Sequence, residues 1–278
     1  MFNGLLKHIG DLKQLTWLTL LQDKKITADG VKHLAALVNL EGLSISYADD
    51  LNSSALVHLT KLKRLKSLGT SKMKISEDDL KHLRVFVDLE SFGANSANFT
   101  DRGVKHLLKL KSLKKLYLND TKVTNAGVAM LGQMEQLEVI DLGVTNIGDE
   151  GIKHLKNMKG ITSLSLTRTS VTDAGLEHLK NMTKLRHLNL SHTKVSDKGV
   201  NHLRRLTNLE SMYLNDTKIT DGALEPIAAF KKLHFLHLQE TDVTLDGVEN
   251  LQNNVPNCSV ISPTEIHREL SRRKRNRN

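Results

Sequence analysis

Three side chains capable of metal binding or acid–base chemistry recur at one spacing near the end of the chain. His192, Asp216 and Glu240 are each 24 residues apart, and His237 lies close to the last of them. An imidazole and carboxylates can share a divalent metal ion. With Ser191 they also provide the residue types of a Ser-His-Asp triad. Either chemistry requires a fold that places residues 24 apart side by side.

The chain has such a period. The stretch YLNDTKVT at 117 recurs as YLNDTKIT at 213, which is 96 residues, or four periods of 24, further on. Six copies of the strand segment align without a gap: LKKLYL at 113, LEVIDL at 137, ITSLSL at 161, LRHLNL at 185, LESMYL at 209 and LHFLHL at 233. Four earlier copies start at 15, 40, 65 and 89, which gives ten repeats before a degenerate end, VPNCSV at 255.

Each repeat predicts a strand followed by a short helix. In L-x-x-L-x-L, counted as positions one to six, the last two apolar residues alternate, which indicates a strand with one buried face. The second half, T-D-x-G-L-x-x-L-x-x-L, has apolar residues at helical spacing after a Thr and an Asp suited to capping a helix start. One such unit buries too little apolar surface to fold alone, so the repeats must stack into a solenoid.

The repeat L-x-x-L-x-L-x-x-T-x-V-T-D-x-G-L-x-x-L-x-x-L resembles the leucine-rich repeat, specifically the ribonuclease-inhibitor-like short-helix type. It is similar to bacterial arrays of 24-residue repeats and to the repeat region of F-box proteins. Thr stands at position nine, where the general pattern has Asn or Cys, and we expect it to donate hydrogen bonds to turn carbonyls. The resemblance implies binding of protein partners, usually on the concave sheet, without enzymatic chemistry.

The predicted fold is therefore an α/β leucine-rich repeat solenoid, a curved right-handed βα horseshoe. Stacked strands are ~4.8 Å apart whereas packed helices need roughly 8 to 10 Å, so about ten parallel strands should line the concave face and the helices the convex face. We predict an N-terminal partial repeat or cap at 1–14, the ten repeats and a terminal strand at 15–261, and a capping helix with a basic tail at 262–278.

This architecture argues against metal chemistry. Eight histidines share one position on the helical arc, where neighbouring units are too far apart for one ion to bridge them: His8, His33, His58, His82, His106, His154, His178 and His202. For His192, Asp216 and Glu240, cross-strand hydrogen bonding is an equally good explanation. An open sheet also provides no water-excluding pocket for a metal ion. We expect no catalytic residue, no metal and no cofactor.

Positions three, five, seven and eight of each repeat should face solvent on the concave wall. All three tyrosines, Tyr47, Tyr117 and Tyr213, and the single Trp17 fall there. Exposed aromatic and Arg residues commonly anchor protein interfaces, although Tyr is also favoured in strands for its own sake. The third and fourth repeats present mainly Gly and Ser, so the predicted binding face lies on repeats five to ten: Tyr117, Asp141, Arg168, His187, Asn189, His192, Tyr213, Asp216, Phe235, His237 and Glu240.

Composition limits the remaining alternatives. No segment is apolar enough to span a bilayer, and the single Cys258, placed in a buried position, cannot form an internal disulfide, so we expect a cytoplasmic protein. We also expect a monomer that binds a protein or peptide. The net charge is +9, and six basic against two acidic residues put +4 of it in residues 262–278. Nucleic-acid association through this tail is one alternative, and substrate recognition in a larger ubiquitin-ligase-like assembly is another.

Overall fold

The computed structural model describes residues 2–21, 26–46 and 51–277, and it divides into two compact units, Met1–Ile140 and Asp141–Asn278. The first unit contains, in chain order, α1 (Phe2–Gly10), β1 (Trp17–Leu21), α2 (Ala28–Val31), η1 (Lys32–Ala36), β2 (Gly42–Ser46), α3 (Ala55–Leu59), β3 (Ser67–Gly69), η2 (Asp79–Val85), β4 (Ser91–Gly93), α4 (Asp101–Leu107), β5 (Lys115–Tyr117) and α5 (Asn125–Leu131). The segments labelled η are 3-10 helices. Strand β6 (Val139–Asp141) spans the boundary between the units.

The second unit continues the same alternation of strand and helix. It contains α6 (Asp149–Ile152), η3 (Lys153–Leu155), β7 (Ser163–Ser165), α7 (Asp173–Glu177), β8 (His187–Asn189), α8 (Asp197–His202), β9 (Ser211–Tyr213), η4 (Asp221–Ala223), α9 (Leu224–Ala228), β10 (Phe235–His237), α10 (Leu245–Asn254), β11 (Ser259–Ile261) and α11 (Thr264–Arg277). The ten expected strands are therefore present in the described residues, and the degenerate end adds β11.

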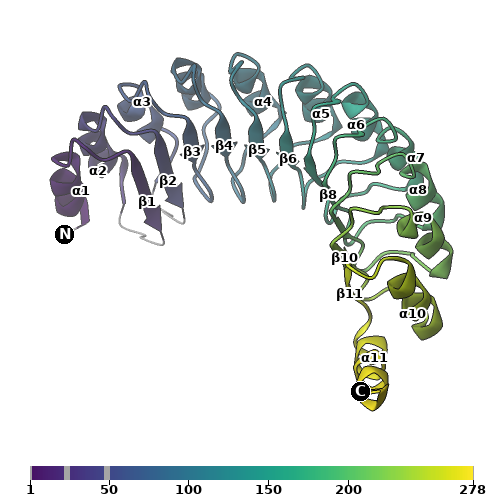
Figure 1. Ribbon diagram of the computed structural model, residues 1–278. Coiled ribbons are helices and arrows are strands. Elements are labelled where there is room, and N and C mark those ends of the chain that lie inside the picture. The colour runs from purple at the N-terminus through teal and green to yellow at the C-terminus, as the bar shows by residue number, and fades with distance from the viewer. Residues whose placement is uncertain (1, 22–25, 47–50, 278) are drawn as a thin grey trace. The chain divides into compact units, whose positions relative to one another are not determined.

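Within each unit the strands are parallel and neighbour one another in chain order, with equivalent repeat positions side by side. In the first unit, Ser91 of β4 pairs with Lys115 of β5. In the second unit, His187 of β8 pairs with Ser211 of β9, which pairs with Phe235 of β10. Strands lie on one side of each unit and helices on the other (Figure 1). This arrangement confirms the predicted leucine-rich repeat solenoid fold.

The core of each unit lies between its strands and its helices. In the fifth repeat, Leu113, Leu116 and Leu118 at positions one, four and six are fully buried, as are Val128 and Leu131 of α5. The predicted alternation of buried and solvent-facing positions is therefore correct. Because burial of one such side chain contributes ~1.5 to 3 kcal/mol, the repeated leucines supply most of the driving force for stacking.

Threonines at position nine close the turn after each strand. Their hydroxyls donate to the carbonyl of position six in the same repeat, as Thr121 Oγ1 does to Leu118 at 2.7 Å and Thr217 Oγ1 to Leu214 at 2.6 Å. The same bond forms at Thr145, Thr169, Thr193 and Thr241. The turn-closing role predicted for these threonines is confirmed.

The aspartate at position thirteen has a different role from the one predicted. The preceding Thr caps the helix, since Thr172 Oγ1 accepts from Ala174 N at 3.3 Å. Asp149, however, accepts from Thr172 of the following repeat, through Oδ1 from the backbone N–H at 2.8 Å and through Oδ2 from the hydroxyl at 2.6 Å. We call this pair of bonds the inter-repeat clamp. It recurs between Asp101 and Thr124, Asp173 and Ser196, Asp197 and Thr220, and Asp221 and Thr244.

The clamp explains the glycine at position fifteen. A Cβ atom built on Gly175 would overlap the Asp149 carboxylate, and one on Gly127 would overlap that of Asp101. Only a residue without a side chain allows the carboxylate of the preceding repeat to approach the helix this closely.

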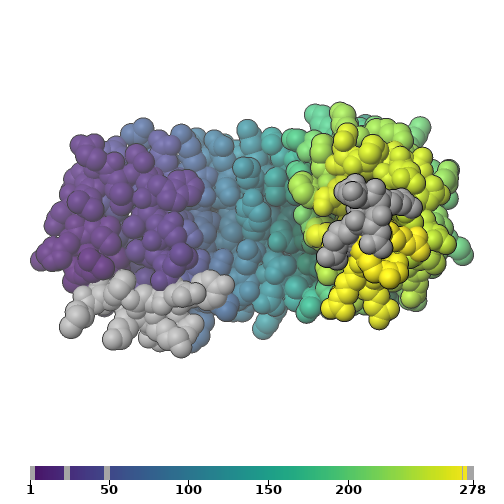
Figure 2. Space-filling view, turned by 60° about the horizontal axis from the view of Figure 1, so that its bottom comes forward, coloured from purple at the N-terminus to yellow at the C-terminus, as the bar shows by residue number. Residues whose placement is uncertain are grey.

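The C-terminal end departs from the spacing of VPNCSV, in which Cys258 falls at position four, and its capping helix extends into the basic tail. The register pairs Ser259 with Phe235 and Val260 with Leu236, so Val260 holds position four and Cys258 comes two residues earlier, although its side chain is still buried. The basic segment also continues the capping helix, because α11 runs through Arg277 instead of ending early. The start of α11 packs on the last repeat, where Leu270 is buried, and Figure 2 shows the described C-terminal residues of the second unit in yellow.

Candidate functional site

The second unit carries most of the predicted binding residues on one surface. We name this surface the C-terminal strand face. It consists of the solvent-facing side chains of β7–β11 and of position eight in the turns after β7–β10. Its side chains form three rows, because parallel pairing places equivalent positions of successive repeats next to one another.

The row at position five is centred on an aromatic pair. The rings of Tyr213 and His237 stack with their centroids 4.5 Å apart and an interplanar angle of 37°. Burial lowers the pKa of His237 below its usual value, so the ring in this pair is neutral at pH 7. A neutral imidazole stacked on a phenol forms a half-buried, rigid contact area on β9 and β10.

The row at position three contains the most exposed aromatic side chain of the unit. Phe235 is 53% exposed, while its neighbour Ser211 is buried and shares a hydrogen bond with His187 Nδ1 at 3.2 Å. On β10, Phe235 and His237 are two residues apart and therefore point to the same side of the sheet. Phe235 and the Tyr213–His237 pair thus form one aromatic patch.

The row at position eight has an unusual backbone. Arg168, His192, Asp216 and Glu240 have φ angles of 53°, 57°, 49° and 56°, in the left-handed region. The conformation continues the inter-repeat ladder beyond the strand, because the His192 N–H donates to the Asn215 carbonyl at 2.7 Å. His192 Nδ1 and Asp216 Oδ2 are 2.8 Å apart, as expected for a cross-strand pair. The Asp216 side chain remains 58% exposed, and Glu240 is also exposed.

Two predicted residues already serve the fold. Asp141 Oδ1 accepts from the Gly143 backbone N–H at 3.0 Å, and Asn189 Oδ1 accepts from the Ser191 N–H at 3.0 Å. Each side chain therefore closes the turn that follows its own strand, and only its second polar atom is left for a ligand.

Tyr117, another predicted binding residue, belongs to the first unit. It lies on β5 in the first unit, half-buried and beside Gly93. Tyr47 lies outside the described residues. Gly69 and Gly93 leave β3 and β4, the strands of the third and fourth repeats, with little side-chain surface, as the sequence predicted.

An ion pair beside the C-terminal strand face was not predicted. Arg186 at position two donates to both carboxylate oxygens of Glu210, at 2.7 and 2.8 Å, and this contact lowers the pKa of Glu210. The sequence signal for this ion pair was the placement of opposite charges, Arg186 and Glu210, one repeat apart. The bidentate geometry holds the edges of β8 and β9 together next to His187.

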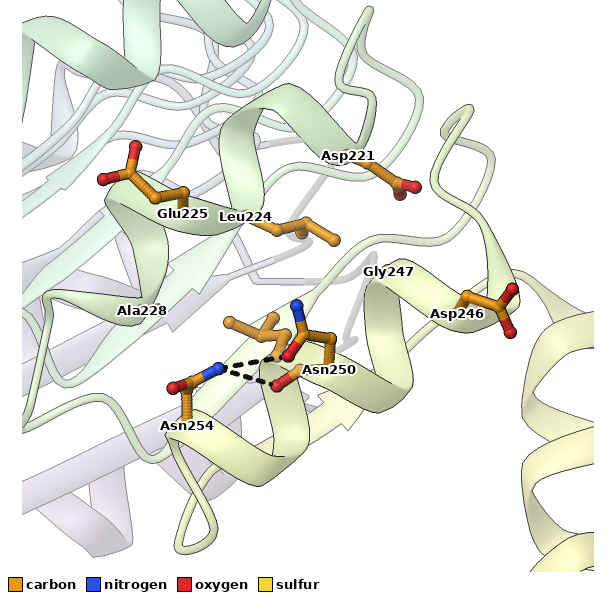
Figure 3. Close-up of a pocket in the computed structure, with 9 residues that line it drawn as sticks. Asp221, Leu224, Glu225, Ala228, Asp246, Gly247, Asn250 and Asn254 are labelled. Atoms are coloured by element: carbon orange, nitrogen blue, oxygen red, sulfur yellow. Dashed lines mark hydrogen bonds between the residues drawn. The ribbon is translucent and has the colours of Figure 1, made fainter.

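On the helix side, a hollow of about 470 Å³ lies between α9 and α10 (Figure 3). Its polar groups are largely engaged with the protein itself. Asp221 holds the inter-repeat clamp with Thr244, and Asn254 Nδ2 donates to the Asn250 carbonyl at 2.9 Å. Beneath them, Leu224 and Leu251 belong to the core. The hollow therefore reflects the packing of two helices.

Within 2–21, 26–46 and 51–277, no three His, Cys, Asp or Glu side chains are placed to share a metal ion. Ser191 is buried, and the His192 ring is directed to Asp216. No helix in the described part of the chain combines the length and apolar character needed to cross a bilayer.

Comparison with known proteins agrees with the fold. The leucine rich repeat family model matches residues 159–219. A sequence comparison with curated proteins finds no match. An internalin (inlF) from Listeria monocytogenes is similar in structure, with a TM-score of 0.53 and 17% identity over 94% of each chain.

Two further solved structures are similar. Internalin C2 (inlC2) from Listeria monocytogenes has a TM-score of 0.58 and 20% identity, covering 85% of this chain and 92% of that one. The plant peptide hormone receptor RGFR1, in complex with RGF2, has a TM-score of 0.53 and 14% identity, covering 92% of this chain and 45% of the receptor chain. With the registered repeats, these matches show that the chain has the leucine-rich repeat fold.

Proposed function

We propose that this chain is a non-enzymatic interaction scaffold whose C-terminal strand face binds a segment of a protein partner. The observation that carries the proposal is the aromatic patch of Phe235, Tyr213 and His237. Large aromatic side chains left exposed on a rigid sheet are the groups that most often dominate binding energy in protein interfaces. The similar plant receptor, which is in complex with RGF2, supports the use of this fold for ligand binding.

The chemistry of the face favours a particular kind of segment. An apolar side chain of the partner would cover Phe235 and the Tyr213–His237 pair. Asp216 and Glu240 at the adjacent edge are exposed carboxylates, so a basic residue next to the apolar one would be attracted there. The expected ligand is thus a peptide segment with an apolar anchor followed or preceded by Lys or Arg.

Selection from a random peptide library tests this proposal. Peptides selected on the wild-type protein should share the apolar–basic pattern, and Tyr213→Ala with Phe235→Ala should weaken their binding at least ~10-fold, as for loss of an interface anchor. The matched control is Asn201→Ala with Arg205→Ala on the helix side of the same unit, where both side chains are exposed. Selection of unrelated peptides, or equal binding by both double variants, would refute the proposed site.

A nucleic-acid role has weaker support. The basic residues lie along α11, but Arg272 is paired with Glu269 and Arg273 with Glu249, which leaves less charge for phosphates. If the tail binds nucleic acid, this binding should depend steeply on salt concentration. It should also be lost when residues 271–278 are removed. Peptide binding to the C-terminal strand face should be unaffected by the same truncation.

A further inference from the structure

The row of side chains at position eight extends one residue beyond the C-terminal strand face. Val144, in the turn after β6, has the same left-handed backbone, and its N–H donates to the Thr167 carbonyl at 2.7 Å. The Arg168 N–H repeats this bond to the Ser191 carbonyl at 2.9 Å, and all of these residues belong to the second unit. What we call the position-eight row therefore runs through successive turns at the spacing of parallel strands, ~4.8 Å: Val144, Arg168, His192, Asp216 and Glu240.

Val144 is the residue of this row that suits its backbone least. A φ of 53° is unfavourable for a β-branched side chain, whereas Gly adopts it without a steric cost. The side chain also gains little from the core, because Val144 is 40% exposed. Strained residues cluster at sites that bind ligands. The exposed methyl groups of Val144 are therefore a candidate contact for an apolar side chain.

The unpaired charges of the row have opposite signs. Arg168 and Glu240 are both exposed, and neither side chain has a hydrogen bond or ion pair within the described part of the chain. Between them, His192 and Asp216 are engaged with each other at 2.8 Å. Arg168 and Glu240 are three strand spacings apart, or ~14 Å. The row thus presents a cation near one end and a carboxylate at the other.

The carboxylate end of the row opens into a hollow of about 530 Å³ between the turn after β10 and the start of α11. Glu240, Asp242 and Glu265 line it, and Ile266 adds an apolar side for the stem of a long side chain. The three carboxylates are exposed, and they are not placed to share a metal ion in the part of the chain that the structure describes. A Lys or Arg side chain matches this hollow, whereas Arg168 matches a carboxylate.

We propose that the position-eight row sets the residue pattern of the bound peptide segment and decides which end of it lies on which repeat. An extended chain advances ~3.3 Å per residue and its side chains alternate between two sides. An acidic residue on Arg168 and a basic residue in the hollow, ~14 Å apart, are then four positions apart and point to the same side. This inference rests on the proposed function, because it adds contacts to the segment that covers the aromatic patch.

The contact with Val144 completes the pattern. Six residues of an extended chain span ~20 Å, which matches the four strand spacings, ~19 Å, between Val144 and Glu240. An apolar residue on Val144 is therefore two positions from the acidic residue, on the side away from the basic one. The expected segment has an apolar residue, an acidic residue two positions on and a basic residue four positions after that.

Peptides selected from a random library on the wild-type protein test the charge pattern. Their acidic and basic residues should be four positions apart, and Arg168→Glu should weaken their binding at least ~10-fold by placing like charges together. The same peptide with its acidic residue replaced by Lys should bind this variant at least ~10-fold more tightly than it binds the wild type. Glu240, which has the same backbone, shows that the turn accepts Glu. The matched control, Arg205→Glu at an exposed position on the helix side, should leave binding unchanged.

Val144→Gly separates the ligand contact from the stability of the fold. Relief of the backbone strain should raise the urea midpoint, while loss of the methyl groups should weaken peptide binding at least ~3-fold. Unchanged binding by Val144→Gly or by Arg168→Glu, or selected peptides that lack the four-position spacing, would overturn the inference. If Tyr213→Ala with Phe235→Ala still weakens binding in that case, the proposed function stands and only the role of the position-eight row fails.

Discussion

Removing one carboxylate of the inter-repeat clamp should destabilise the second unit, and the size of the effect can be estimated from its bonds. Asp149→Ala deletes the acceptors of the Thr172 N–H at 2.8 Å and of the Thr172 hydroxyl at 2.6 Å. A hydrogen bond to a charged group contributes ~1.5 to 3 kcal/mol, and an abandoned donor adds its own cost. For this half-buried pair we expect a loss of about 2 to 4 kcal/mol.

A double-mutant cycle separates the clamp from a general loss of charge. Gly175→Ala alone should also be destabilising, because the new Cβ overlaps the Asp149 carboxylate. In the Asp149→Ala background the overlap with the carboxylate disappears and only a close approach to Val171 Cγ1 at 3.1 Å remains. The higher helix propensity of Ala, ~1 kcal/mol over Gly, should then make the same change much less destabilising than it is in the wild type. The two substitutions therefore have to be strongly non-additive.

Urea unfolding followed by circular dichroism measures these free energies. The matched control is Asp246→Ala, an exposed carboxylate at the start of α10, which should change stability by less than ~0.5 kcal/mol. If Asp149→Ala costs no more than this control, or if the two substitutions in the cycle are additive, the clamp does not couple the repeats.

Three further predictions use the same unfolding measurement or a labelling rate. Val144 has a φ of 53°, which is costly for a β-branched residue, so Val144→Gly should raise stability by ~1 kcal/mol; a loss would show that the side chain matters more than the backbone. Burial lowers the pKa of His106, with a smaller lowering by Arg84 that Glu77 opposes. Because the fold favours the neutral ring, the contribution of His106 to the free energy of unfolding is full above pH ~6.5 and declines as the pH falls below that value. His106→Gln should reduce the loss of stability between pH 7 and 5, whereas His202→Gln, at the exposed equivalent position, should not; equal effects would contradict the assignment. Burial raises the pKa of Cys258 to about 11, so a thiol reagent at pH 8 should label the folded protein far more slowly than the urea-unfolded protein, and equal rates would contradict its buried position.

The strand and helix pattern could be predicted because it repeats. Leucines at positions one, four and six, such as Leu113, Leu116 and Leu118, define a period that one burial pattern satisfies. The degenerate end is a single copy. Val255 and Cys258 have the spacing of the leucines at positions one and four, but the strand register places Val260, two residues after Cys258, at position four. A single imperfect copy cannot fix its own register.

Contacts between repeats were harder to predict than positions within them. A Thr-Asp pair before a helix has the sequence of an ordinary cap, and only stacking reveals that Asp149 bonds to the next repeat instead. The same limit applies to the binding surface, where the sequence predicted the rows that contain Tyr213 and His237 but not the stacking of their rings. Asp141 and Asn189 were predicted as ligand contacts although each supports its own turn, because side-chain bonds to the local backbone leave no periodic signal.

Site-specific photo-crosslinking tests the central claim, that the C-terminal strand face is where this protein binds its partner. A photoreactive phenylalanine analogue replaces Phe235 in one variant and the exposed Arg205 of the helix side in another, and both are irradiated in extracts of the source organism. The account predicts one discrete protein adduct from position 235, competed by the selected peptide, and none from position 205. Adducts of equal yield from both positions, or adducts from position 205 alone, would contradict it.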